Sequence, residues 1–284
     1  MSDMVVVRYR DTREEMEIIS RRKTMTKVLA TTLNVVLLFA VFTTFTCAVF
    51  AQGNAATYHV FPQIADGTFP DGSSYSSVLF ATNTSAVSAN CTYRLYGLSG
   101  DRVAAPSPFD PFVLPAFGGF TIRGTKGTAS FASGYATLSC EQPVAASVLY
   151  LFGSTSGILG LATVFSAPRS LVAQYTVPNT NTGFRLGLAI ANDTDLDEQY
   201  LVILSTSDGA EVGRINLTIQ ARSTIARFVN ELFTVPPTGF FGSVAIISAK
   251  TLSGASGGEF RTVGLLFLGS TFSTMPPTVL RFAQ

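Results

Sequence analysis

Tryptophan is absent from this chain of 284 residues, and histidine occurs once, as His59. Charged residues make up only 13% of the chain. A single imidazole leaves little material for acid–base or nucleophilic catalysis of the kinds that depend on histidine. We therefore expect a protein that is not an enzyme and that needs no cofactor.

A basic surface is also lacking once the first 51 residues are set aside. Seven of the 19 basic and five of the 18 acidic residues precede residue 52, which leaves 12 basic against 13 acidic residues. Proteins that bind nucleic acid need clustered positive charge to displace counterions from phosphates. We expect no nucleic-acid partner.

Long stretches of helical periodicity are missing from residue 52 onward. Phenylalanine is abundant, with 23 residues, and Gly, Ser, Thr and Val fill much of the remainder. This mixture suits half-buried strands that are separated by tight turns. The bulk of the chain is predicted to be β.

The segment after residue 52 contains an internal duplication. Four pairs of segments correspond: 58–62 with 175–178, 78–84 with 186–194, 99–101 with 207–209, and 134–136 with 242–244. Equivalent positions lie 108 residues apart at Gly134 and Gly242, and 109 apart at Asn83 and Asn192. Units of about 110 residues are long enough for a core in each. We predict one repeat over 56–166 and another over 170–284.

Short apolar segments recur at intervals of about ten residues in both repeats, with Gly, Asn, Asp and Pro between them. Strands are predicted in the first repeat at 78–82, 92–96, 112–114, 120–123, 135–140 and 147–152. They are predicted in the second at 184–190, 200–204, 215–220, 241–248 and 263–268. Segment 226–233 changes to a spacing of four and predicts a short helix. The pattern indicates two tandem antiparallel β-sandwiches, immunoglobulin-like in the architectural sense.

Residues 28–51 carry no charge and follow Arg21, Arg22, Lys23 and Lys27. This arrangement predicts an export signal with cleavage between Ala51 and Gln52. The competing interpretation is an uncleaved anchor, because 24 uncharged residues can span a bilayer about 30 Å thick. A membrane would then be contacted only through 28–51. Under either interpretation residues 1–51 form a charged N-terminal segment plus signal or anchor, and the repeats are extracellular or on the cell surface.

Cysteine is scarce, and the exported part retains only Cys91 and Cys140. Two thiols outside the cell favour one disulfide, which would join two strands distant in sequence. The alternative is a pair of free buried thiols. The second repeat has Gln199 or Tyr200 near the first position and Ser248 at the second, so the disulfide is expected in the first repeat alone.

Carboxylates alternate at Asp193, Asp195 and Asp197, which makes this loop a weak candidate for calcium. A complete EF-hand loop would need glycine and glutamate where Glu198 and Leu204 stand. The alternative interpretation is a solvated turn between two strands. His59 is expected to be an exposed residue of an edge strand.

Aromatic side chains at Tyr75, Tyr93, Tyr96 and Phe109 could form a platform for sugars. The tail 278–282 could pair with the sheet edge of a neighbouring molecule. These features favour a glycan-binding module and a filament subunit respectively, as alternatives to a more general binding role.

The strand that ends in Ala-x-Asn, the Asp-Gly turn, and segment 226–233 followed by Phe240-Phe241-Gly242-Ser243-Val244 resemble tandem repeats of about 110 residues found in exported bacterial proteins of unassigned function. The resemblance covers roughly 56–284 and implies a β-sandwich fold and an exported location. It carries no catalytic residue. The expected function is surface attachment (adhesion), assembly or recognition of a surface ligand, either a glycan or a protein.

Overall fold

A computed structural model describes residues 55–103, 111–123, 131–234 and 239–279. The chain divides into two units, Met1–Gln52 and Gly53–Gln284, and the description below concerns the second. The predictions for 1–51, including cleavage between Ala51 and Gln52, lie outside the described residues. Within the described part, no helix is long and apolar enough to cross a membrane.

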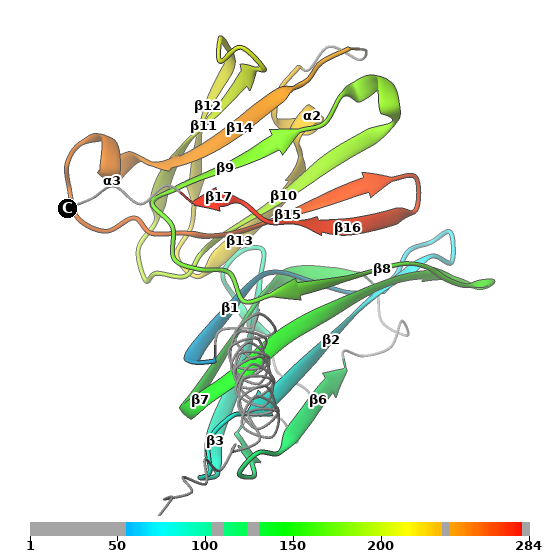
Figure 1. Cartoon of the computed structure of the whole chain (residues 1–284), viewed down its shortest axis with the longest axis vertical. Helices are drawn as coiled ribbons and strands as arrows, with labels where there is room; N and C mark the ends of the chain where they lie inside the picture. The colour runs from blue at the N-terminus through cyan, green and yellow to red at the C-terminus, as the bar shows by residue number, and fades with distance from the viewer. Residues whose placement is uncertain (1–54, 104–110, 124–130, 235–238, 280–284) are drawn as a thin grey trace, which may run out of the picture. The chain divides into compact units, whose positions relative to one another are not determined.

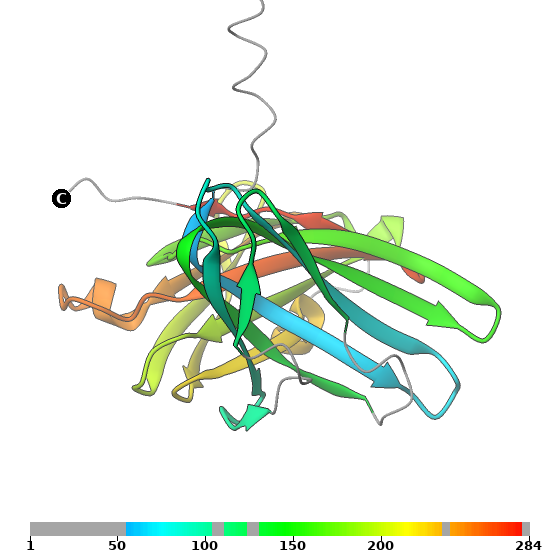
Figure 2. The ribbon, with the colours of Figure 1, turned by 90° about the horizontal axis from the view of Figure 1, so that it is seen from below.

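The first half of this unit is a single antiparallel system in which the long strand β7 pairs with β1, β2, β3 and β8 (Figure 1). Its strands are β1 (Ala56–Thr68), β2 (Ser74–Asn83), β3 (Ala89–Gly97), β4 (Arg102–Val103), β5 (Phe112–Leu114), β6 (Gly119–Arg123), β7 (Ala132–Ser154) and β8 (Gly157–Phe165). β7 and β8 run side by side to a turn at 155–156, which can be followed in Figures 1 and 2.

β7 changes partners along its length and so links two layers. Its residues 134–140 pair with β3, and 144–153 pair with β2. Leu138 and Val148, one from each part of β7, enter the same buried cluster, which lies between the layers. The sequence predicted two separate strands here. One strand runs through instead. Pro143, which has no N–H to donate, lies between the two paired parts, where the partners change.

The second half contains two antiparallel sheets, in the orders β13-β10-β15-β16 and β12-β11-β14-β9-β17. Its strands are β9 (Val172–Val177), β10 (Phe184–Asn192), β11 (Glu198–Thr206), β12 (Glu211–Ile219), β13 (Ser223–Phe228), β14 (Gly242–Ser248), β15 (Arg261–Leu268), β16 (Thr271–Met275) and β17 (Thr278–Val279). Short helices are η2 (Thr180–Thr182), α2 (Val229–Leu232) and α3 (Ala249–Leu252).

The chain is thus mostly antiparallel strand and sandwich-like, as the sequence predicted. The helix predicted over 226–233 is shorter, because Ala226 to Phe228 pair with β10 as the end of β13. Helix α3 was not anticipated. With the glycine-rich loop that follows, it connects β14 to β15, whereas β7 runs straight through in the first half. The tail was predicted to pair with a neighbouring molecule, but its residues Thr278 and Val279 pair with β9 of the same chain.

Two asparagines mark equivalent places in the halves. The side-chain amide of Asn83 donates to the carbonyls of Val87, Leu114 and Pro115. The amide of Asn192 donates in the same pattern, to the carbonyls of Leu196, Ile219 and Gln220. Both asparagines are buried, so each closes the loop after its strand from inside.

Two glycines also correspond. A Cβ on Gly134 would lie 1.9 Å from the Tyr96 carbonyl oxygen, and one on Gly242 would lie 2.0 Å from that of Ser205. Both positions therefore need glycine for the close approach of a neighbouring strand. The likeness of 58–62 to 175–178 misaligns the first strands, because Phe61 pairs with Ala136 and Tyr175 with Val244. Phe61 and Tyr175 both fill the core, so they are the equivalent residues.

The predicted disulfide joins Cys91 of β3 to Cys140 of β7, which are directly paired in the sheet. Closing a loop with a sequence separation of 49 residues stabilises the fold by about 4 kcal/mol in the chain-entropy account. Tyr200 and Ser248 pair at the equivalent place of the second half. The second half therefore replaces the covalent link with a buried tyrosine.

The sheet β13-β10-β15-β16 is covered on both faces. On one face Leu186, Leu188 and Ile190 enter the core of the second half. On the other face Ala189, Val263 and Phe272 join the core cluster of the first half. The small residues between the leucines of β10 therefore face the other half and allow it to approach closely.

Candidate functional site

The loop after β10 carries the acidic residues singled out in the sequence. Asn192 holds its shape, because its side-chain oxygen accepts from the Thr194 backbone N–H at 3.1 Å while its amide donates to the Leu196 carbonyl at 2.7 Å. Asp197 accepts from the Ala221 backbone N–H at 2.9 Å. The loop is thereby joined to residues 220–222, which precede β13.

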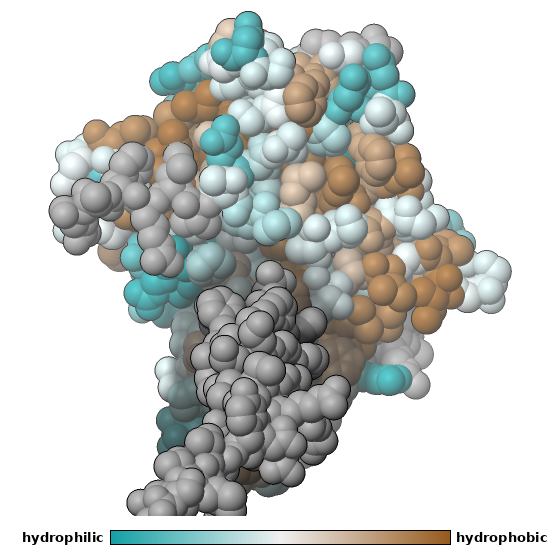
Figure 3. Space-filling model, in the orientation of Figure 1, coloured by the Kyte–Doolittle hydropathy of each residue, from teal (hydrophilic) through white to brown (hydrophobic). Residues whose placement is uncertain are grey.

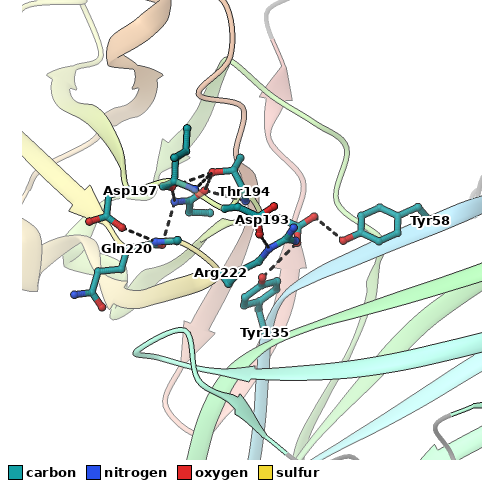
Figure 4. A network of polar contacts seen from close by, with 11 residues as sticks. Tyr58, Tyr135, Asp193, Thr194, Asp197, Gln220 and Arg222 are labelled. Atoms are coloured by element: carbon teal, nitrogen blue, oxygen red, sulfur yellow. Dashed lines mark hydrogen bonds and ion pairs between the residues drawn. The ribbon is translucent and has the colours of Figure 1, made fainter.

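Asp193 is the centre of a network that both halves build (Figure 4). It accepts from the hydroxyl of Tyr58 at 2.8 Å and from that of Tyr135 at 3.3 Å. Its other partner is the Arg222 guanidinium, 2.9 Å away. The Asp193 side chain is only 11% exposed. A carboxylate so placed needs charged and hydroxyl partners, and it receives them from β1, β7 and the loop before β13.

Arg222 also donates to Asp195, at 2.8 Å. This hydrogen bond and the two aspartate charges raise the pKa of Arg222 above its usual range. Arg222 has a φ of 55°, a left-handed conformation that is uncommon for a residue with a side chain. Its backbone N–H donates to the Thr194 carbonyl at 3.0 Å, which helps to hold that conformation.

The tyrosines of the network are not free to ionise near neutral pH. Burial and the neighbouring Asp193 carboxylate raise the pKa of Tyr58 to about 12. Burial raises the pKa of Tyr135 further, and its ring stacks on that of Tyr96 with centroids 4.8 Å apart. Both hydroxyls therefore act as hydrogen-bond donors toward Asp193.

A polar cleft of about 450 Å³ opens beside this network. Alternate residues of neighbouring strands line it because they share one face of the sheet. Its lining residues are Tyr58, Thr92, Arg94, Tyr96, Thr137, Ser139, Arg169, Asp193 and Arg222. Arg222 is paired with aspartates, and Arg169 lies 3.2 Å from Glu259. Within the described part of the chain, Arg94 is exposed and has no carboxylate partner.

The three aspartates of the calcium candidate already have partners within the protein. Asp193 and Asp195 bind Arg222, and Asp197 binds a backbone N–H. Among the described residues, no group of three or more His, Cys, Asp or Glu side chains could hold a metal ion. The carboxylates here neutralise a cation from the protein itself.

His59 was expected to be exposed, and this prediction was wrong. The side chain is 1% exposed, and its Nε2 lies 2.8 Å from the Val144 carbonyl oxygen and 3.1 Å from that of Ala56. Burial lowers its pKa. β1 is not an open edge, because residues 166 and 167 hydrogen-bond to Val60.

The proposed sugar platform is not assembled as a group. Tyr93 is buried in the core, Tyr75 contacts Phe272 between the halves, and Phe109 lies outside the described residues. Tyr96 alone lines the polar cleft. Sequence reasoning missed Arg94 and Arg222. Alternation along the strand puts Arg94 on the same face as Tyr96, which is the signal that would have found it, but no local signal places Arg222 there.

Two other cavities lie among the described residues. One of about 330 Å³ lies between the halves and is mainly apolar, with Tyr75, Leu265 and Phe272 in its wall. Another of about 640 Å³ lies beside α2 in the second half. The polar cleft is lined by charged and hydroxyl groups from both halves.

No family model matches this chain, and no curated protein matches it. Three similar solved structures are of infectious bursal disease virus. "Structure of infectious bursal disease virus Gx strain" has 13% identity over 79% of this chain and 77% of that chain, with a TM-score of 0.21.

The second is "Crystal structure of infectious bursal disease virus VP2 subviral particle", with 14% identity over 75% of this chain and 66% of that chain, and a TM-score of 0.18. The third, a T13 particle of the same virus, has 13% identity over 76% of this chain and 65% of that chain, and a TM-score of 0.19. Similarity at this level gives no basis for transferring a function.

Proposed function

We propose that this is an exported, non-enzymatic protein of two tandem immunoglobulin-like β-sandwich domains that recognises a ligand in the polar cleft. The observation that carries the proposal is that the cleft is built jointly. Its strand residues come from the first half and Asp193 and Arg222 from the second. Such a cleft exists only when the halves are packed together, and its volume is in the range of pockets for small ligands.

The ligand class follows from Arg94. The other two arginines of the cleft already have carboxylate partners, so Arg94 is the cation left for a ligand. A guanidinium binds carboxylate or sulfate through paired N–H groups. The hydroxyls of Thr92, Thr137 and Ser139 suit a hydroxyl-rich ligand, and the Tyr96 ring offers a stacking surface. We therefore favour an acidic glycan over a neutral one.

The test compares acidic and neutral sugars of the same length. Oligosaccharides of uronic acid should raise the melting temperature of the purified protein, and the neutral counterparts should raise it much less. Arg94→Gln should weaken binding roughly tenfold or more, since a charge-assisted hydrogen bond contributes about 1.5–3 kcal/mol. Arg123→Gln, at another exposed arginine on β6, is the matched control. The proposal fails if acidic glycans bind Arg94→Gln as tightly as the unmodified protein.

Export is supported by the disulfide, because such bonds persist in oxidising compartments. An N-terminus at Gln52 in the protein recovered from its host would establish cleavage, and a chain that retains 28–51 would establish an anchor. Either outcome leaves the ligand proposal standing, since the cleft uses residues from Tyr58 onward. Surface attachment would then follow from what the cleft binds.

A further inference from the structure

The first half has an apolar outer face that the core does not use. Phe80 of β2 and Phe165 of β8 lie in one row across the sheet, because both pair with Ser147. Leu151 and Leu161 form another row. We call Phe80, Leu149, Leu151, Leu161 and Phe165 the apolar face. Their neighbours Leu79, Val148 and Val164 belong to the core, so the apolar face points the opposite way.

Much of the apolar face is open. Phe80, Leu161 and Phe165 are 42%, 57% and 47% exposed. Ile158 and Leu159, near the turn of the same hairpin, are exposed as well. Figure 3 shows apolar side chains gathered over the β7–β8 hairpin. Contiguous exposed apolar side chains mark an interaction surface, whereas isolated ones need no explanation.

The duplication shows what such a face is built to contact. Counting back from the equivalent asparagines, Phe80 corresponds to Ala189, since each lies three residues before its asparagine. Phe80 pairs with Ser147 and Ala189 pairs with Val263, so Ser147 corresponds to Val263 and Leu149, two residues later, corresponds to Leu265. By the same count along the next strand, Leu161 corresponds to Phe272. In the second half, these residues pack against the first half. One copy of the face is therefore covered by a neighbouring half, whereas the other buries Val78 but leaves Phe80, Leu161 and Phe165 exposed.

The surface that covers the second half's face has a counterpart too. Tyr75 and Phe152 pair at the end of β2 and β7, and the Tyr75 ring lies 6.2 Å from that of Phe272. The equivalent pair in the second half is Phe184 and Leu268, since Phe184 precedes Asn192 as Tyr75 precedes Asn83. Leu268 is 45% exposed. We call this pair the receiving end.

We propose that a second copy of this chain covers the apolar face, in a head-to-tail contact that places it on the receiving end of that copy. The contact repeats between molecules the packing already present between the two halves of one molecule. It joins different surfaces of two copies, so it is heterologous and extends to a filament or closes to a ring. This assembly does not depend on a ligand in the polar cleft.

Photo-crosslinking of the full chain in its host tests the contact directly. Benzoylphenylalanine in place of Leu161, an exposed position, should give dimers and higher multimers. The crosslinked peptides should contain Phe184 or Leu268 of the other copy. The same probe in place of Val212, 52% exposed on β12, is the matched control and should give no ladder. Crosslinks only to residues 1–52, or from one apolar face to another, would overturn the proposal.

A mixing experiment separates head-to-tail contact from a symmetric dimer. Leu161→Asp should block the apolar face and Leu268→Asp the receiving end, so each variant alone should lose multimers at least about tenfold. Together, with different tags, they should form one-to-one pairs and nothing longer. Phe165→Asp serves if Leu161→Asp does not keep the melting temperature of the unmodified protein. Normal assembly by Leu268→Asp alone, or no pairs in the mixture, would refute the head-to-tail contact.

Discussion

Removal of the Asn192 side chain should be among the most destabilising single changes in this protein. The side chain is fully buried. Its amide donates to three backbone carbonyls at 2.7–3.0 Å, and its oxygen accepts from Thr194. Asn192→Ala leaves these groups without that partner. An unsatisfied buried group costs about 1–3 kcal/mol, and some of these groups can turn to water, so we expect a total of about 3–5 kcal/mol.

Urea unfolding of the purified protein measures this loss, and the melting temperature should fall by roughly 10 °C for a unit of this size. Asn83→Ala is the matched variant, because Asn83 makes the same three amide bonds in the first half. Asn216→Ala, at an exposed position on β12, should change stability by less than about 0.5 kcal/mol. A loss below about 1 kcal/mol for Asn192→Ala would refute the reasoning.

Two further predictions concern the first half. Reduction of the disulfide, or Cys91→Ser with Cys140→Ser, should lower the free energy of unfolding by about 4 kcal/mol, and an unchanged urea midpoint in protein shown by mass to be reduced would contradict this. Because burial lowers the pKa of His59 below 6.5, the unfolded state binds more protons below that pH, and stability should fall as the pH drops from 6.5 toward the folded pKa. His59→Gln should lack this fall, and identical pH profiles of melting temperature for the two proteins would disprove it.

The sequence determined the strand content, because alternation of apolar and polar residues is a local property of the chain. It also determined the disulfide, since Cys91 and Cys140 are the only cysteines after residue 51. The duplication was visible because Asn83 and Asn192, and likewise Gly134 and Gly242, occupy positions that require that type of amino acid. A buried amide that donates to three carbonyls is one such requirement, and a glycine pressed against a carbonyl is another.

The sequence misjudged His59 for a physical reason. Edge exposure depends on what lies beside β1, and residues 166 and 167, more than 100 positions away, hydrogen-bond to it. The same applies to Arg222. Its type and position gave no sign that it would pair with Asp193, 29 positions earlier in the same half, or that it would lie beside Tyr135. The second contact requires the two halves to pack together.

β10 shows the division most plainly. The alternation of Leu186, Leu188 and Ile190 with smaller residues told which side chains share a face, because a strand alternates by geometry. It could not tell that the face of Ala189 would be buried as well. That was decided by the first half, whose apolar residues cover Ala189. At the equivalent position of the first half, Phe80 is exposed. A strand encodes its two faces locally, but what covers each face comes from residues far away in the chain.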